Sequence, residues 1–133
     1  MDTKEALEQI LAASNKPDTK DRIVSRFVIG KHIRQGDISI IRLDALPNRE
    51  MDRTQERQLV AGNTLGSRHT LTGEAEIYCL RNAGPLEGPV FLAVDNVRIA
   101  HPTHADVYLP DGGTYSITYQ RDFAAEEVAR LAD

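Results

Sequence analysis

Apolar and polar residues alternate over short stretches along most of the chain, which is the pattern of half-buried β-strands. The clearest example is residues 114–121, where Tyr115, Ile117 and Tyr119 share one face and polar residues share the other. Similar runs, bounded by turn-forming residues, occupy residues 37–43, 58–61, 66–71, 74–80, 90–94, 97–100 and 105–109. Eight or nine short strands predict a mainly β fold, either an antiparallel sandwich or a small barrel.

The strongest turn signal lies between the last two of these strands. Residues 110–113 read Pro-Asp-Gly-Gly, with proline favoured at the entry of a turn and glycine where φ is positive. We therefore predict a β-hairpin whose turn is Asp111, Gly112 and Gly113. Residues 48–56 carry many charges and few apolar side chains, so they are expected to form an exposed loop.

The N-terminus has a helical pattern. Leu7, Ile10 and Leu11 form part of one apolar stripe on a helix predicted over residues 3–14. A helix this short is marginal by itself. The stripe is therefore expected to dock on the rest of the domain or on another subunit.

The remaining segments complete the predicted organisation. Residues 15–26 are polar and charged and are interpreted as a linker arm, whereas residues 124–132 have the pattern of a short closing helix. We divide the chain into an N-terminal helix and arm over residues 1–30 and a β domain over residues 31–133.

A basic cluster marks the end of the predicted arm: Arg22, Arg26, Lys31, His32 and Arg34. It could contact an acidic protein surface or nucleic acid. The whole chain has a formal net charge of -4, which argues against nucleic acid. We therefore assign Arg22 and Arg26, with the apolar stripe, to a protein-interaction surface.

The composition further narrows the class of protein to which the chain can belong. The 133 residues are 41% hydrophobic and 27% charged, which is typical of one globular domain. The single cysteine, Cys79, excludes an internal disulfide and is expected to be a buried small apolar residue. Neither a signal peptide nor a membrane-spanning run is present in the sequence. A cytoplasmic protein, or a virion protein if the gene belongs to a phage, is therefore expected.

Three histidines are the best candidates for chemistry. His101 and His104 form a His-x-x-His pair around Pro102, whose turn could bring both imidazoles together, and His69 could join them if its strand lies alongside. Three imidazoles are a known zinc ligand set. The alternative is that these are ordinary polar residues of loops and strands. No cofactor other than a divalent metal is indicated, and no motif predicts a catalytic residue.

Several segments resemble a family of small, uncharacterised bacterial and phage proteins. They are Gln-Gly-Asp at residues 35–37, a glycine-rich stretch ending in histidine at 62–69, His-x-x-His at 101–104, Leu-Pro-Asp-Gly-Gly-Thr-Tyr at 109–115 and Gln-Arg at 120–121. The resemblance extends over residues 34–133. It implies a shared fold and a phage or mobile-element setting.

The chain departs from the family pattern at polar positions. Ser67 stands in place of a histidine, Asn63 in place of a glutamate, and Pro102 and Thr103 in place of two glutamates. Turn and strand signatures are kept better than these polar ones, so the resemblance implies a retained fold more than a retained activity.

Two functional hypotheses follow. The first is a non-enzymatic structural or interaction protein, such as a phage virion or assembly component or a mobile-element accessory protein, which acts through a protein partner or as a homo-oligomer. The second is a metal-binding domain or metal-dependent enzyme built on His69, His101 and His104.

Overall fold

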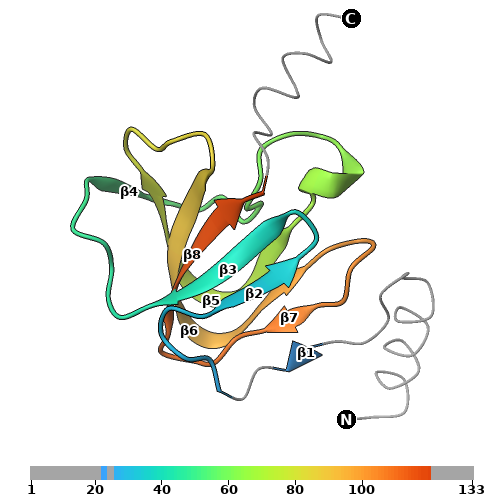
Figure 1. Cartoon of the computed structure of the whole chain (residues 1–133), viewed down its shortest axis with the longest axis horizontal. Coiled ribbons are helices and arrows are strands. Elements are labelled where there is room, and N and C mark those ends of the chain that lie inside the picture. Colours follow the sequence, from blue (N-terminus) through green and yellow to red (C-terminus); the bar gives the residue numbers. More distant parts are fainter. Residues whose placement is uncertain (1–21, 24–25, 121–133) are drawn as a thin grey trace, which may run out of the picture.

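The computed structural model describes residues 22–23 and 26–120, and this part of the chain is mainly β (Figure 1). The strands are β1 (Arg22–Ile23), β2 (His32–Gln35), β3 (Ile38–Leu43), β4 (Met51–Thr54), β5 (Thr70–Leu80), β6 (Glu87–Ala100), β7 (Val107–Tyr108) and β8 (Thr114–Tyr119). The described residues contain one short 3-10 helix, Leu65–Ser67, labelled η1. The helices predicted over residues 3–14 and 124–132 lie outside the described residues.

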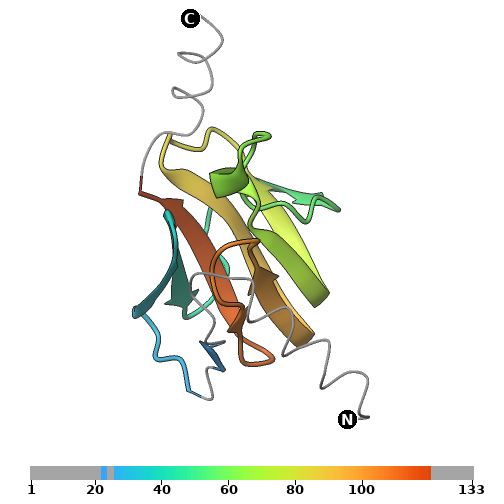
Figure 2. The ribbon, with the colours of Figure 1, turned by 90° about the vertical axis from the view of Figure 1, so that its right-hand side faces the viewer.

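All eight strands belong to one sheet built around β6. β5 pairs with one edge of β6, while β8 and β7 pair with different halves of its other edge (Figure 2). β3 and then β2 follow β8, and β4 extends the sheet beyond β5. Every pairing is antiparallel except that of β1 with β7.

The mainly β, antiparallel prediction is therefore confirmed. The small barrel is wrong, because the outer strands β2 and β4 do not pair with each other and the sheet stays open. The two separate sheets of a sandwich are not seen among the described strands.

The core forms where the alternating strands turn their apolar faces inward. In β3 and β8, Ile40 and Ile117 lie opposite each other and both are buried, as expected for strands with one solvated face. The central cluster of buried core residues is Phe27, Ile38, Ile40, Leu59, Val60, Leu71, Ile77, Phe91, Ala93, Val97, Ile99, Val107, Leu109, Tyr115 and Ile117.

The predicted hairpin is wrong, because β7 and β8 do not pair with each other. Val107 lies opposite Ile99 and Thr114 opposite Leu92, so both strands keep one register along β6. Between them, the N–H of Gly112 donates to the carbonyl of Ala93 at 2.6 Å. The predicted turn itself is present at Asp111 and Gly112, where Gly112 has a φ of 79°. The turn does not reverse the chain, because β7 before it and β8 after it run in the same direction along β6.

β5 and β6 also contain turn-forming residues that do not reverse the chain. Gly73 and Asn96 fall between stretches predicted as separate strands, 66–71 and 74–80 and then 90–94 and 97–100. Both lie within continuous strands at positive φ, 92° and 52°. A β-carbon at Gly73 would lie 2.1 Å from the carbonyl oxygen of Asn96. The register shifts here between Thr72 and Ala75, so these residues form a β-bulge and not a turn.

Two segments predicted to be irregular contain strands. β4 lies within the expected exposed loop. Its Asp52 forms an ion pair with Arg81, just after β5, and its Arg53 with Glu76 in β5. A polar edge strand of this kind has no apolar alternation to reveal it.

The predicted arm also joins the sheet, because it includes β1, and Phe27 is part of the core. Residues before Arg22 lie outside the described part, so the division of the chain at residue 30 stays a prediction.

Candidate functional site

The three histidines singled out in the sequence lie together at one end of β5 and β6. The ring centroids of His69 and His101 are 4.4 Å apart, and those of His101 and His104 are 4.7 Å apart. They meet because Thr70 pairs with Ala100, which places the residues flanking these strand ends side by side. His69 and His101 are buried.

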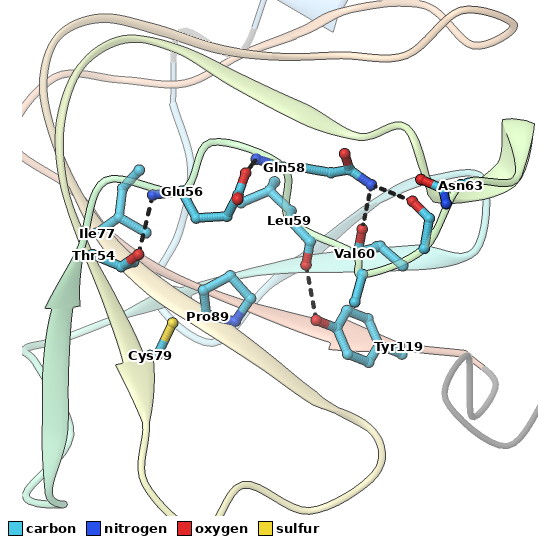
Figure 3. Close-up of a pocket in the computed structure, with 12 residues that line it drawn as sticks. Thr54, Glu56, Gln58, Leu59, Val60, Asn63, Ile77, Cys79, Pro89 and Tyr119 are labelled. Carbon is cyan, nitrogen blue, oxygen red and sulfur yellow. Dashed lines mark hydrogen bonds between the residues drawn. The ribbon is translucent and has the colours of Figure 1, made fainter. Parts of the chain in front are cut away.

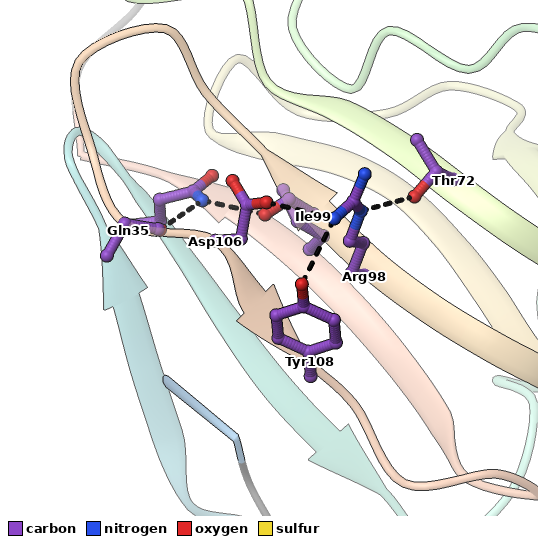
Figure 4. A network of polar contacts seen from close by, with 7 residues as sticks. Gln35, Thr72, Arg98, Ile99, Asp106 and Tyr108 are labelled. Carbon is purple, nitrogen blue, oxygen red and sulfur yellow. Dashed lines mark hydrogen bonds and ion pairs between the residues drawn. The ribbon is translucent and has the colours of Figure 1, made fainter. Parts of the chain in front are cut away.

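Gln35, at the end of β2, holds this cluster in place and is itself fully buried. Its amide nitrogen donates to the carbonyl of Ile99 (Figure 4) and to that of Ala105, both at 2.9 Å. Its oxygen therefore faces Nδ1 of His69 at 2.8 Å. Because that oxygen can only accept, Nδ1 of His69 carries the proton and Nε2 is left with a lone pair.

The surroundings keep His69 neutral. Burial lowers the pKa of His69 to about 3, and the neighbouring His101 and His104 act in the same direction against a smaller opposite effect from the backbone of Gly66. Nε2 of His69 makes no hydrogen bond within the described residues. His69 is therefore a buried, neutral residue whose Nε2 can accept a hydrogen bond.

His101 has the opposite arrangement. Its Nδ1 accepts the backbone N–H of Thr103 at 3.1 Å. A backbone N–H can only donate, so the single proton of a neutral His101 ring must sit on Nε2. In this arrangement Nε2 of His101 has no lone pair to give to a metal, whereas a histidine that binds metal through Nε2 donates its other N–H to an acceptor.

A metal centre is consequently not preformed here. Among the described residues, no group of three or more His, Cys, Asp or Glu side chains is arranged to hold a metal ion. A depression of about 330 Å³ next to the cluster is lined by His101 but by neither of the other two histidines. The three-histidine metal site stays a prediction, and the hydrogen bond to His101 counts against it.

The Gln-Gly pair at the start of the family resemblance has a structural explanation in this cluster. Gly36 has a φ of 57°, and a β-carbon there would lie 2.7 Å from Nε2 of His104. Gln35 thus anchors His69, while Gly36 leaves room for His104. The sequence reasoning noted the motif but missed this role, and the resemblance was the one signal that could have indicated it.

A second polar network ties β5, β6 and β7 together beside the cluster. The guanidinium of Arg98 lies 3.3 Å from the Asp106 carboxylate and donates to the hydroxyls of Tyr108 at 3.0 Å and Thr72 at 3.2 Å (Figure 4). Asp106 is buried. No sequence pattern identified this network, since its members are far apart along the chain.

A groove of about 460 Å³ lies between the 55–63 loop and the sheet. Figure 3 shows Pro89 and Cys79 facing the side chains of this loop, with Tyr119 at one end. Ala61, Cys79 and Pro89 provide accessible apolar walls, and Leu59, Val60 and Ile77 lie buried behind them. We call this hollow the 55–63 groove.

The loop that forms the groove is held by its own hydrogen bonds. The side-chain amide of Gln58 donates to the carbonyls of Val60 at 2.7 Å and Gly62 at 2.9 Å. The N–H of Leu59 donates to the carbonyl of His69, and its carbonyl accepts the Tyr119 hydroxyl, both at 2.8 Å. The groove is therefore preformed.

The groove has little charge. Glu56 is the one charged residue among the described residues that line it. Burial raises the pKa of Tyr119 to about 12, with a further contribution from Cys79, so the phenol stays protonated at neutral pH. Cys79 is exposed at the groove, so the prediction that it is buried is wrong.

Most of the predicted interaction residues lie outside the described part of the chain. Leu7, Ile10 and Leu11 lie outside the described residues. Arg22 lies in β1, and Arg26 is exposed just before the core residue Phe27. Their assignment to an interaction surface stays a prediction.

One protein family matches most of the described region. Its model, a domain of unknown function designated DUF8820, covers residues 34–120. The chain belongs to the DUF8820 family. The matched DUF8820 region begins next to Gln35 and ends next to Tyr119, so it includes both the histidine cluster and the 55–63 groove. No curated protein and no solved structure has significant similarity to the chain. No helix among the described residues is long and apolar enough to cross a membrane.

Proposed function

We propose that this DUF8820 protein is a non-enzymatic interaction module whose 55–63 groove receives a segment of a protein partner. The observation that carries the proposal is a preformed hollow with apolar walls and a polar rim, the usual form of a binding site. In the phage or mobile-element setting that the resemblance implies, the partner would be another component of a virion or assembly apparatus.

Preorganisation favours binding at this place. Gln58 and Tyr119 fix the loop through hydrogen bonds to its carbonyls, so little loop entropy remains to be lost when a partner binds. Ala61, Cys79 and Pro89 offer apolar contact, and the burial of apolar surface is the main source of affinity in such sites.

The same groove is poorly equipped for catalysis. Cys79 is the one thiol, and no histidine is among the described residues that line the groove. A cysteine nucleophile needs a neighbouring base or a lowered pKa to form its thiolate. These observations support binding without covalent chemistry.

The proposal is tested by selecting peptides from a random displayed library on the full chain. Ala61→Trp fills the groove, and Ala83→Trp places the same side chain at another exposed loop position as a control. We expect the selected peptides to lose at least tenfold in affinity for the first variant, or about 1.4 kcal/mol, and to bind the second normally. Selected peptides that bind Ala61→Trp unchanged, or a library without binders, would contradict the proposal.

Metal binding at the histidine cluster is the second candidate, favoured by the three adjacent rings and the lone pair on Nε2 of His69. Elemental analysis of protein purified without an affinity tag is the test. Stoichiometric zinc, manganese, iron or nickel, together with a melting temperature lowered by a chelator, would support this candidate. Their absence would remove it.

A further inference from the structure

We infer that the 55–63 groove selects a cationic side chain, an arginine or lysine flanked by apolar residues in the partner segment. This rests on the proposed function, because it names the partner chemistry of the same groove. The inference starts from charge. Glu56 gives the described lining one negative charge, and no lysine, arginine or histidine is among the described residues of that lining.

The Glu56 carboxylate is held at the groove. One of its oxygens accepts the N–H of Gln58 at 2.9 Å, and the N–H of Glu56 donates to the Thr54 hydroxyl at 3.0 Å. These two bonds fix the residue at both its backbone and its side chain. A carboxylate positioned in this way can accept further hydrogen bonds from a cation without loss of its existing one.

Glu56 differs from Glu50, Asp52, Glu76 and Glu87, the acidic residues around β4 and β5 that form ion pairs. Arg81 pairs with Asp52, Arg53 with Glu76 and Arg49 with Glu87. Within the described residues, no lysine, arginine or histidine forms an ion pair with Glu56. Its negative charge is therefore available to a cation from another molecule.

The apolar walls fit the other part of such a side chain. Arginine and lysine place their aliphatic stems on apolar surface while the charged group reaches a polar partner. Ala61, Cys79 and Pro89 supply that surface in the groove that Glu56 also lines. An acidic side chain would find the same walls but would meet the carboxylate, which repels it.

Two matched peptides test the selection on the full chain: acetyl-Leu-Arg-Leu-amide and the same peptide with citrulline, which is neutral and nearly isosteric with arginine. Titration calorimetry or amide chemical shifts report the two dissociation constants. We expect the arginine peptide to bind about tenfold more tightly at low salt, and this preference to weaken as salt is added.

Glu56→Gln removes the charge and keeps an oxygen that can accept the Gln58 N–H. We expect it to abolish the arginine preference, whereas Glu74→Gln, a change at an exposed glutamate of β5 outside the groove lining, leaves it intact. Equal binding of both peptides to the natural chain would overturn the inference. So would a preference that survives in Glu56→Gln, or free arginine competing as well as the peptide.

The two proposals fail in different ways. If displayed peptides bind the groove but are neutral or acidic, the cation selection is wrong and the interaction module stands. If no peptide binds in a manner that Ala61→Trp blocks, both proposals are wrong.

Discussion

The histidine cluster and the 55–63 groove lie on either side of one hydrogen bond, from the N–H of Leu59 to the carbonyl of His69, yet they use polar groups in opposite ways. In the cluster, Gln35 forms a hydrogen bond with Nδ1 of His69, and the N–H of Thr103 donates to Nδ1 of His101. In the groove, Gln58 satisfies the loop and leaves an apolar hollow with Glu56 at its edge. Two of the three histidines singled out in the sequence, His69 and His101, are buried, whereas the 55–63 loop, which carries no such motif, lines an accessible groove.

The difference follows from the cost of burial. A buried polar group must find a partner or lose about 1–3 kcal/mol, so histidines that enter the interior come with dedicated partners such as Gln35. A loop at the surface is under no such demand. Once its own carbonyls are satisfied, its remaining groups are available to other molecules.

The largest expected effect is at the cluster. Gln35→Leu leaves three buried polar groups without their partner, namely Nδ1 of His69 and the carbonyls of Ile99 and Ala105. We expect the free energy of unfolding to fall by about 3 kcal/mol, measured by urea denaturation. Gln120→Leu is the control, because that exposed side chain makes one hydrogen bond, to Ser39. A loss no larger than in the control would show that the cluster does not depend on Gln35.

A second change tests how tightly the cluster is packed. Gly36→Ala introduces a methyl group against the His104 ring at a positive φ, whereas Gly30→Ala has the positive φ but no atom within 4 Å. We expect losses of about 2 and about 1 kcal/mol in the free energy of unfolding, respectively. Equal losses would mean that His104 moves away freely and that the cluster is loose.

The third change removes a bond that shapes the groove. Tyr119→Phe loses the hydroxyl that donates to Leu59, so we expect the free energy of unfolding to fall by about 1 kcal/mol. Tyr78→Phe, whose hydroxyl donates to Glu76 at 3.3 Å on a more exposed face, is the control and should lose less.

The same tyrosine gives the natural chain an alkaline signature. The folded pKa of Tyr119 is about 12, while an unfolded tyrosine ionises near about 10. The unfolded state therefore loses this proton first, and stability that is present below pH ~10 is lost as the pH rises toward ~12. We expect Tyr119→Phe to show a shallower decline over this range than the natural chain. If the stability of both proteins declines in parallel over this range, the Tyr119 hydroxyl is exposed to water in the folded state.

The smallest effect on folding is expected at the groove rim. Glu56→Gln keeps an acceptor for Gln58 and changes an exposed charge, so the free energy of unfolding should change by less than about 0.5 kcal/mol. We expect Glu56→Gln to change peptide binding instead. A large loss of stability would mean that Glu56 is a structural residue and would weaken its role in selection.

Sequence reasoning recovered what local patterns determine. Alternation identified β3 and β8, and the strand pairing of Thr70 with Ala100 brought the three histidines together as the spacing suggested. Gly73, Asn96 and Gly112 were recognised as residues with turn chemistry, and all three have positive φ. Local chemistry decides φ, but long-range pairing decides whether the chain reverses, so bulges were mistaken for turns.

The groove could not be predicted for the same reason. Its shape depends on the bond between Tyr119 and Leu59, which are distant in the sequence. Ile77 and Cys79 point to the same face of β5, but Ile77 is buried and Cys79 is exposed, and alternation alone cannot distinguish their depths. The two buried networks around Gln35 and Arg98 likewise join residues that only the folded sheet brings together.

The central claim is that the groove, and not the histidine cluster, is where this protein meets other molecules. Nitrogen-15 spectra of the full chain test it most directly, with acetyl-Leu-Arg-Leu-amide and equimolar zinc added separately. We expect the peptide to shift the amides of the 55–63 loop, Cys79 and Tyr119, and zinc to leave the ring nitrogens of His69, His101 and His104 unchanged. Stoichiometric zinc shifts at those ring nitrogens, with no peptide response in the groove, would contradict the claim.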